Sequence, residues 1–240
     1  MKKDNYTPKI QLFLLPYAGG TAIAYHSLID KLDSKIDKFA IEYPGHGGRK
    51  SEPYVSDFET LLEDVAFQIN SKIDLECNIA IFGYSLGAIV GFELIRNKKL
   101  LKLPSALFIA AQENPILNSF SEKLSDWSED GIINYTVALG GIDERILKNR
   151  RFLLAFMEPI IRDYMLRLEY KFNPDKDKIK CNTIIFYSCD DTPRETVEGW
   201  RELIEADCCF IEFNGNHFFI KKYTVEIAKV INQFLEKIVI

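Results

Sequence analysis

The sequence predicts an α/β fold with a mostly parallel, doubly wound sheet and helices on both faces. Short runs rich in β-branched and aromatic residues recur along the chain. They are apolar throughout instead of alternating, which is typical of strands covered on both faces. Segments with helical periodicity lie between them, and strand alternating with helix indicates right-handed βαβ units. Ligands of such sheets bind at the carboxyl ends of the strands, so we expect the chemistry in the loops there.

The expected elements follow from these patterns in chain order. The clearest helix covers 57–73, where apolar residues recur at spacings of three and four, and Ser56 and Glu59 have the spacing of a capping box at its start. Thr192 and the proline after it predict another capped helix just after Asp191. The expected strands are residues 10–15, 39–43, 78–82, 106–110, 183–187 and 210–213.

One stretch departs from the alternation. Residues 115–172 have helical periodicity but no strand pattern, and no repeat, low-complexity tract or linker marks a boundary around them. A chain of 240 residues fits one core. We therefore expect a single domain over 1–240 with a helical insertion over about 115–172.

Composition and charge exclude several classes of protein. With 47% hydrophobic and 27% charged residues, the chain reads as an ordinary globular protein. Its net charge of −5 is spread along the sequence without a basic stripe, which argues against nucleic acid as a partner. The apolar run after the basic start is short and contains Gln11, which argues against a signal peptide or a membrane span. We expect a monomer in the cytoplasm without stable membrane association.

The five cysteines indicate neither a disulfide framework nor a metal site. Their number is odd, there is no CxxC spacing, and no histidine lies at a metal-finger distance from them. We expect free, buried thiols and no metal. A redox switch at the adjacent Cys208 and Cys209 is the alternative.

The candidate nucleophile is Ser85, in Gly83-Tyr84-Ser85-Leu86-Gly87. This pentapeptide directly follows the expected strand 78–82 and directly precedes a helical pattern over 86–97. The pentapeptide alone is weak evidence for a nucleophile. Between a strand and a helix, however, it has the context of a nucleophile elbow. The turn exposes the serine at a helix N-terminus, whose partial positive charge favours the oxyanion of acyl transfer.

A serine hydroxyl needs a base to take its proton. His217 is the candidate base, because it lies in the loop immediately after the last expected strand. His26 and His46 are interpreted as a helix-surface residue and a turn residue. In this fold the acid falls between serine and histidine along the chain, and Asp190 and Asp191 end the strand 183–187. We prefer Asp191, directly before the expected helix, and Asp190 stays open as the alternative.

The oxyanion hole is expected from two backbone N–H groups. One belongs to Leu86, the residue after the nucleophile, and the other to the loop after the first strand. Two glycines in that loop allow its N–H groups to turn inward, so Ala18 is the second candidate donor. The alternative is a plain glycine turn.

Several stretches together resemble the stand-alone type II thioesterases of nonribosomal peptide and polyketide synthase systems. The resemblance covers nearly the whole chain, and the combination is more specific than any one motif. One departure is Tyr187-Ser188-Cys189, where many members have a glycine-rich turn before the acid. The stretches are Leu15-Pro16-Tyr17-Ala18-Gly19-Gly20, Tyr43-Pro44-Gly45-His46-Gly47-Gly48-Arg49, the serine pentapeptide, Leu139-Gly140-Gly141 with Arg162-Asp163-Tyr164, the loop from Asp190-Asp191 to Trp200, and Gly215-Asn216-His217-Phe218-Phe219.

The resemblance implies an α/β-hydrolase fold in which 115–172 form a helical lid. It implies hydrolysis of acyl thioesters on acyl or peptidyl carrier proteins, through a Ser-His-Asp triad and an acyl-enzyme. The phosphopantetheine arm belongs to that substrate, so no cofactor of the enzyme itself is expected. Two alternatives remain at this point: a generic carboxylesterase acting on oxygen esters, and a catalytically silent interaction module.

Overall fold

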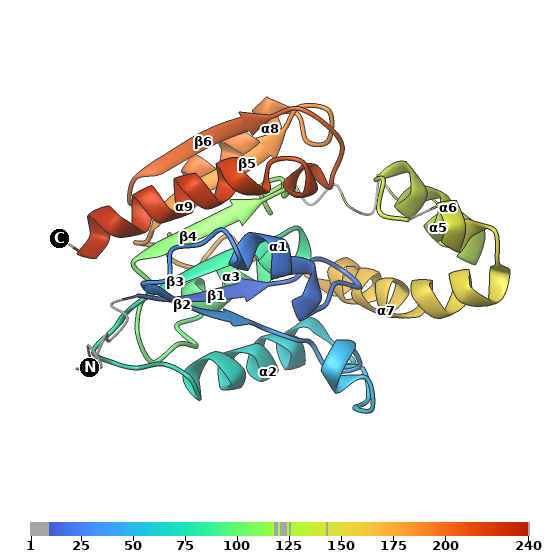
Figure 1. Ribbon diagram of the computed structural model, residues 1–240, viewed down its shortest axis with the longest axis horizontal. Coiled ribbons are helices and arrows are strands. Elements are labelled where there is room, and N and C mark those ends of the chain that lie inside the picture. The colour runs from blue at the N-terminus through green and yellow to red at the C-terminus, as the bar shows by residue number, and fades with distance from the viewer. Residues whose placement is uncertain (1–9, 118–119, 121–123, 125, 143, 240) are drawn as a thin grey trace, which may run out of the picture.

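The computed structural model describes residues 10–117, 120, 124, 126–142 and 144–239. The basic start of the chain and small parts of the expected insertion lie outside these residues. The described strands form one parallel sheet, which confirms the predicted fold class (Figure 1). Its spatial order is β2-β1-β3-β4-β5-β6. The strands are β1 (Ile10–Leu15), β2 (Ile36–Ala40), β3 (Asn78–Tyr84), β4 (Ala106–Ala110), β5 (Asn182–Ser188) and β6 (Cys208–Phe213).

Strand β2 differs most from its prediction. The strand exists, but the expected bounds 39–43 are wrong: the ladder covers Ile36–Ala40, with Ile36 opposite Ile10 and Ala40 opposite Leu14. β2 is the edge strand beside β1 and is only partly covered, so charged residues such as Asp37 and Lys38 belong to it. The apolar residues that follow leave the ladder near the point where β1 itself ends.

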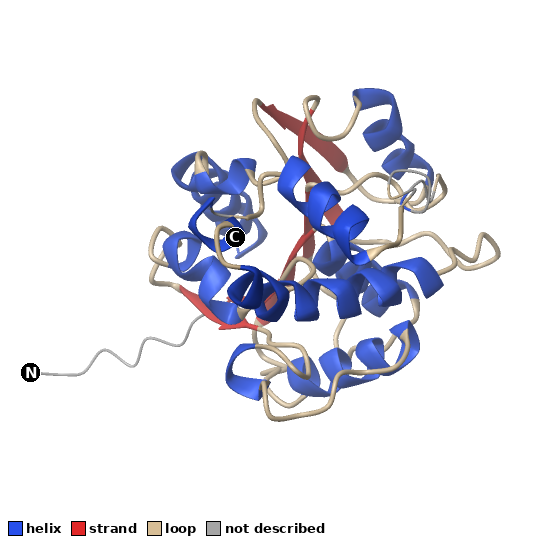
Figure 2. Cartoon of the chain, turned by 90° about the vertical axis from the view of Figure 1, so that its right-hand side faces the viewer, coloured by secondary structure: helices blue, strands red, loops and turns tan. Residues whose placement is uncertain are grey.

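Helices cover both faces of the sheet (Figure 2). Along β1, Leu12 and Leu14 face one apolar cluster while Phe13 and Leu15 face the other. The first cluster includes residues of α1 (His26–Ile29) and α9 (Thr224–Val239), and the second includes residues of α2 (Phe58–Asn70), α3 (Leu86–Arg96) and α8 (Arg194–Glu198). Short 3₁₀ turns are η1 (Ala22–Tyr25), η2 (Gly47–Arg49), η3 (Gly199–Glu202) and η4 (Phe219–Lys221).

Both predicted helix caps are wrong in detail. Asp57 caps α2, because its carboxylate accepts the backbone N–H of Thr60, while the hydroxyl of Ser56 donates to Asp57. Thr192 does not cap α8, which begins only at Arg194. Its hydroxyl donates instead to the carboxylate of Asp191, 3.1 Å away. At α2 the carboxylate of Asp57 is a stronger acceptor than the hydroxyl of Ser56, whereas no side chain caps α8.

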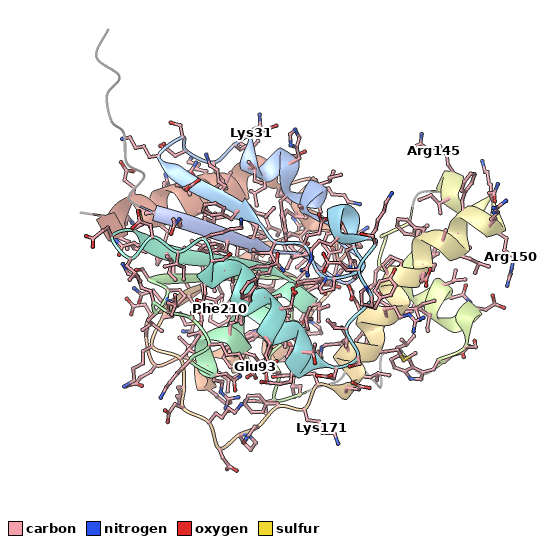
Figure 3. The ribbon with its side chains drawn as sticks, turned by 90° about the horizontal axis from the view of Figure 1, so that it is seen from below. Lys31, Glu93, Arg145, Arg150, Lys171 and Phe210 are labelled. Carbon is pink, nitrogen blue, oxygen red and sulfur yellow. The ribbon has the colours of Figure 1, made fainter. Side chains whose placement is uncertain are left out.

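Among the described residues, the helices that lie between β4 and β5 in the chain and have given bounds are α5 (Glu129–Ala138), α6 (Glu144–Leu147) and α7 (Arg150–Glu169). We call them the inserted helices. They lie beyond the carboxyl ends of the strands (Figure 1), and Arg145 and Arg150 mark their end farthest from the sheet (Figure 3). Their apolar side chains form a third cluster with Leu124. No helix among the described residues is both long enough and apolar enough to cross a membrane.

The expectation of buried thiols holds only in part. Cys77 and Cys181 are buried and free, but Cys189 and Cys209 are exposed and Cys208 is half-buried. Cys208 and Cys209 belong to β6, which is an edge strand of the described sheet beside β5 and is therefore partly open to solvent.

Candidate active site

Ser85 occupies a strained turn between β3 and α3. Its φ of 52° and ψ of −114° lie outside the common regions for a residue with a side chain. Two hydrogen bonds hold this conformation: the N–H of Ser85 donates to the carbonyl of Ala110 at 2.8 Å, and the carbonyl of Ser85 accepts from Ala88 at 2.9 Å. The serine therefore stands at the N-terminus of α3, on the sharp turn that the sequence predicts.

The glycines on either side allow this turn to pack closely. A Cβ atom on Gly83 would lie 2.3 Å from the carbonyl oxygen of Gly87, and one on Gly87 would lie 2.1 Å from that of Leu15. Both distances are far below van der Waals contact. The start of α3 can thus press against the end of β1, which brings the loop after β1 beside Ser85.

His217 and Asp191 come together from the loops after β6 and β5. The Nδ1 atom of His217 lies 2.9 Å from Oδ2 and 3.0 Å from Oδ1 of Asp191. A carboxylate accepts, so Nδ1 carries the proton toward Asp191 and Nε2 is the nitrogen left for a reacting group. The Tyr84 hydroxyl, at the end of β3, donates to the carbonyl of His217 at 2.5 Å and holds the loop that carries the histidine.

Asp190 has a different partner. Its side chain is exposed, and its Oδ2 accepts the backbone N–H of Gly215 at 2.9 Å. The two candidate acids thus both support the histidine loop, but only Asp191 touches the imidazole. Asp190 instead holds the backbone of Gly215, two residues before His217.

The loop after β1 presents Ala18 to the same space. The N–H of Gly20 donates to the carbonyl of Tyr17 at 2.7 Å and closes a turn around Ala18. The N–H of Gly19 is taken by Asp163 of α7. Within the described part of the chain, the backbone N–H groups of Ala18 and Leu86 have no hydrogen-bond partner, as donors to an oxyanion require.

A cavity of about 710 Å³ joins these groups, a volume in the range of small-molecule sites. The sheet side contributes Ser85, His217, Asp191, Ala18 and Leu86. The inserted helices form the opposite wall with Tyr135, Thr136, Phe156, Ile160, Tyr164 and Arg167.

The structure also reveals a buried pair that sequence reasoning missed. His46, interpreted as a turn residue, is buried, and its Nε2 lies 3.1 Å from Oδ2 of Asp163. His26 is exposed and 3.7 Å from Asp30, as expected for a helix-surface residue. Both His46 and Asp163 fall in stretches that carry the family resemblance, which was the available signal, but nothing in the sequence joins them.

The stability of the protein should depend on pH through His46. Burial lowers the pKa of His46, but the hydrogen bond and charge of Asp163, with the carbonyl of Pro44, outweigh it and raise that pKa above its usual value. The charged ring therefore contributes stability that is complete below the unfolded-state pKa, about 6.5, and disappears as pH rises through the higher folded-state pKa. Urea unfolding between pH 6 and 9 should show the free-energy difference between wild type and His46→Gln shrinking with pH. A difference that stays constant or grows would contradict the charged pair.

A serine on a strained turn after a central parallel strand, with a histidine oriented by an aspartate across a cavity, defines an α/β-hydrolase. Comparison with known sequences then gives the family. The sequence model described as "Thioesterase domain" matches residues 10–235, and the chain belongs to this family. It is a hydrolase that acts on thioesters, and the family predicted from the motifs is confirmed.

Relatives match along almost the whole chain. Thioesterase TesA of Mycobacterium marinum is 25% identical over 230 residues, covering 95% of this chain and 91% of TesA. Gramicidin S biosynthesis protein GrsT of Aneurinibacillus migulanus is 24% identical, over 94% of this chain and 88% of GrsT. The crystal structure of ClbQ from the colibactin NRPS/PKS pathway is similar with a TM-score of 0.81 and 25% identity, covering 95% of this chain and 98% of ClbQ.

Proposed function

We propose that this thioesterase hydrolyses acyl groups from the phosphopantetheine arm of carrier proteins in a peptide or polyketide synthase. The carrying observation is the cavity that joins Ser85, the His217–Asp191 pair and the inserted helices. The synthase context is supported by ClbQ, which is described as part of the colibactin NRPS/PKS pathway, and by GrsT, which is named as a gramicidin S biosynthesis protein. We propose a monomer acting in the cytoplasm, with phosphopantetheine supplied by the substrate.

In the acylation step, Ser85 attacks the thioester carbonyl while Nε2 of His217 takes the hydroxyl proton. The carbonyl oxygen becomes an oxyanion, which the N–H groups of Leu86 and Ala18 and the N-terminus of α3 stabilise. The C–S bond then breaks, the thiol leaves with the proton from His217, and the acyl group stays on Ser85. A thiolate is a good leaving group, which favours this step.

In the deacylation step, His217 takes a proton from water, and the resulting hydroxide attacks the acyl-serine ester. Asp191 holds the imidazole in the tautomer with Nδ1 protonated and stabilises the imidazolium that forms. The acid leaves and Ser85 regains its proton from His217. Side chains such as Phe156 and Ile160 provide an apolar wall for the acyl group.

Intact mass spectrometry of a loaded carrier protein tests the proposal. A carrier bearing a short acyl group should lose that group and return to its unacylated phosphopantetheinyl mass in the presence of wild type. The oxygen ester of the same acid is the matched substrate. Cleavage of that ester with the thioester left intact would identify a carboxylesterase, and inactivity on both would identify a silent interaction module.

A further inference from the structure

We propose that Asp163 of α7 is a positioning residue for the oxyanion hole, because its carboxylate fixes the peptide next to Ala18. The proposal rests on the proposed function, since it takes Ala18 and Leu86 as the donors to an oxyanion formed at Ser85. It assigns one of the inserted helices a part in the chemistry besides covering the cavity.

The contact between Asp163 and the loop is short and buried. The N–H of Gly19 donates to Oδ2 of Asp163 at 2.7 Å, although the two residues are 144 positions apart. Asp163 is 2% exposed. One turn earlier on α7, Ile160 covers Gly19 so closely that a Cβ atom there would lie 2.2 Å from Cγ1 of Ile160. Helix α7 therefore rests directly on the loop, and the hydrogen bond is of the stronger, charge-assisted kind.

His46 lies against this buried carboxylate. Its Nε2 lies 3.1 Å from the same Oδ2 atom, and its Nδ1 lies 2.9 Å from the carbonyl oxygen of Pro44. Both neighbours of the ring are acceptors, so the ring with both nitrogens protonated suits both contacts. A buried carboxylate needs such a partner. Three segments thus meet at one oxygen atom: the loops after β1 and β2, and α7.

This arrangement determines which N–H groups face the cavity. Gly19 has a φ of +73°, a region in which glycine can rotate with little steric resistance. Asp163 fixes the peptide after Ala18, and the hydrogen bond from Gly20 to Tyr17 closes the other side of the turn. These two hydrogen bonds fix the peptides on either side of Ala18, so its N–H is held in one orientation toward the cavity. Misplacing a catalytic group by about 1 Å costs about 100-fold in rate.

Two variants of Asp163 distinguish the role of its hydrogen-bond acceptor from the role of its negative charge. Asp163→Leu and Asp163→Asn both remove the carboxylate charge, but only asparagine keeps an oxygen that can accept the N–H of Gly19. We expect Asp163→Leu to lower kcat for thioester hydrolysis about 10- to 100-fold with little change in KM, and Asp163→Asn to stay within about fivefold of wild type. The rate of covalent labelling of Ser85 by a fluorophosphonate should fall in parallel, since that reaction uses the same hole.

Tyr170→Phe is the matched control for packing of the same helix. The Tyr170 hydroxyl donates to Oε1 of Glu93 at 2.7 Å and ties the residue after α7 to α3. Glu93 is labelled in Figure 3. Its loss should lower the melting temperature but leave kcat within about threefold, because the contact is away from the cavity. Equal loss of kcat in Tyr170→Phe and Asp163→Leu would overturn the proposal in favour of helix packing alone.

Two further outcomes also decide the matter. Wild-type labelling rates in Asp163→Leu, or an Asp163→Asn variant as impaired as Asp163→Leu, would overturn the positioning role. If Asp163→Leu does not fold, the double variant with His46→Leu takes its place. It replaces the ion pair by two apolar side chains, which buried sites often tolerate, and it still lacks the acceptor for the N–H of Gly19. Unchanged labelling after Ser85→Ala would instead refute the nucleophile, and with it the proposed function.

Discussion

Replacing Ser85 by alanine should lower thioester hydrolysis by about 10⁴- to 10⁶-fold, the size of loss seen when the nucleophile of a serine triad is removed. Ser85 Oγ is the atom on which the acyl group would reside, and the cavity places it with the His217–Asp191 pair. Without that oxygen, neither His217 nor the oxyanion donors have an acyl-enzyme to act on. The measurement is release of the acyl group from a loaded carrier protein, followed by intact mass.

The variant should fold as well as wild type. Alanine carries a Cβ atom like serine, so it meets the same resistance at φ 52°, and the hydroxyl of Ser85 caps no helix N–H. Ser71→Ala, which removes an exposed hydroxyl at the end of α2, is the control and should keep full activity. Fluorophosphonate labelling that persists in Ser85→Ala would show that another residue is the nucleophile.

The sequence predicted the centre of the fold better than its edges. The bounds of β1 and β4 match their predictions, because buried parallel strands read as uninterrupted apolar runs. At the edge, β2 mixes charged and apolar residues, so the more apolar run just after it gave the wrong bounds. Both predicted helix caps failed because a neighbouring carboxylate changed the hydrogen bonding: Asp57 takes the N–H of Thr60 in place of Ser56, and Asp191 takes the hydroxyl of Thr192.

The candidate site shows the same division. The turn at Ser85 was predictable because strand, turn and helix follow one another directly in the chain, and Gly83 is required by a backbone contact within that unit. The contact of Asp163 with Gly19 was not, because it joins residues 144 positions apart and depends on where α7 rests on the sheet. Sequence patterns report local conformation and burial, whereas such contacts arise only from the packing of distant segments.

Substituting asparagine for Asp191 should lower kcat by about 10⁴-fold, whereas the same substitution at Asp190 should change it by no more than about threefold. Asp191 accepts from Nδ1 of His217 at 2.9 Å. An asparagine there can donate to Nδ1 through its amide nitrogen, which favours the tautomer with Nε2 protonated, and that nitrogen can no longer take the proton of Ser85. The fold should be retained, because the side chain keeps its size.

Asp190→Asn is the matched control, since it makes the same chemical change one residue away. The amide oxygen of asparagine can still accept the N–H of Gly215, so the loop that carries His217 keeps its support. Steady-state kinetics on the loaded carrier protein, with melting temperatures for both variants, provide the comparison. Similar losses of kcat at the two positions would mean that the acid acts by shaping the histidine loop, and the reverse order would make Asp190 the orienting acid.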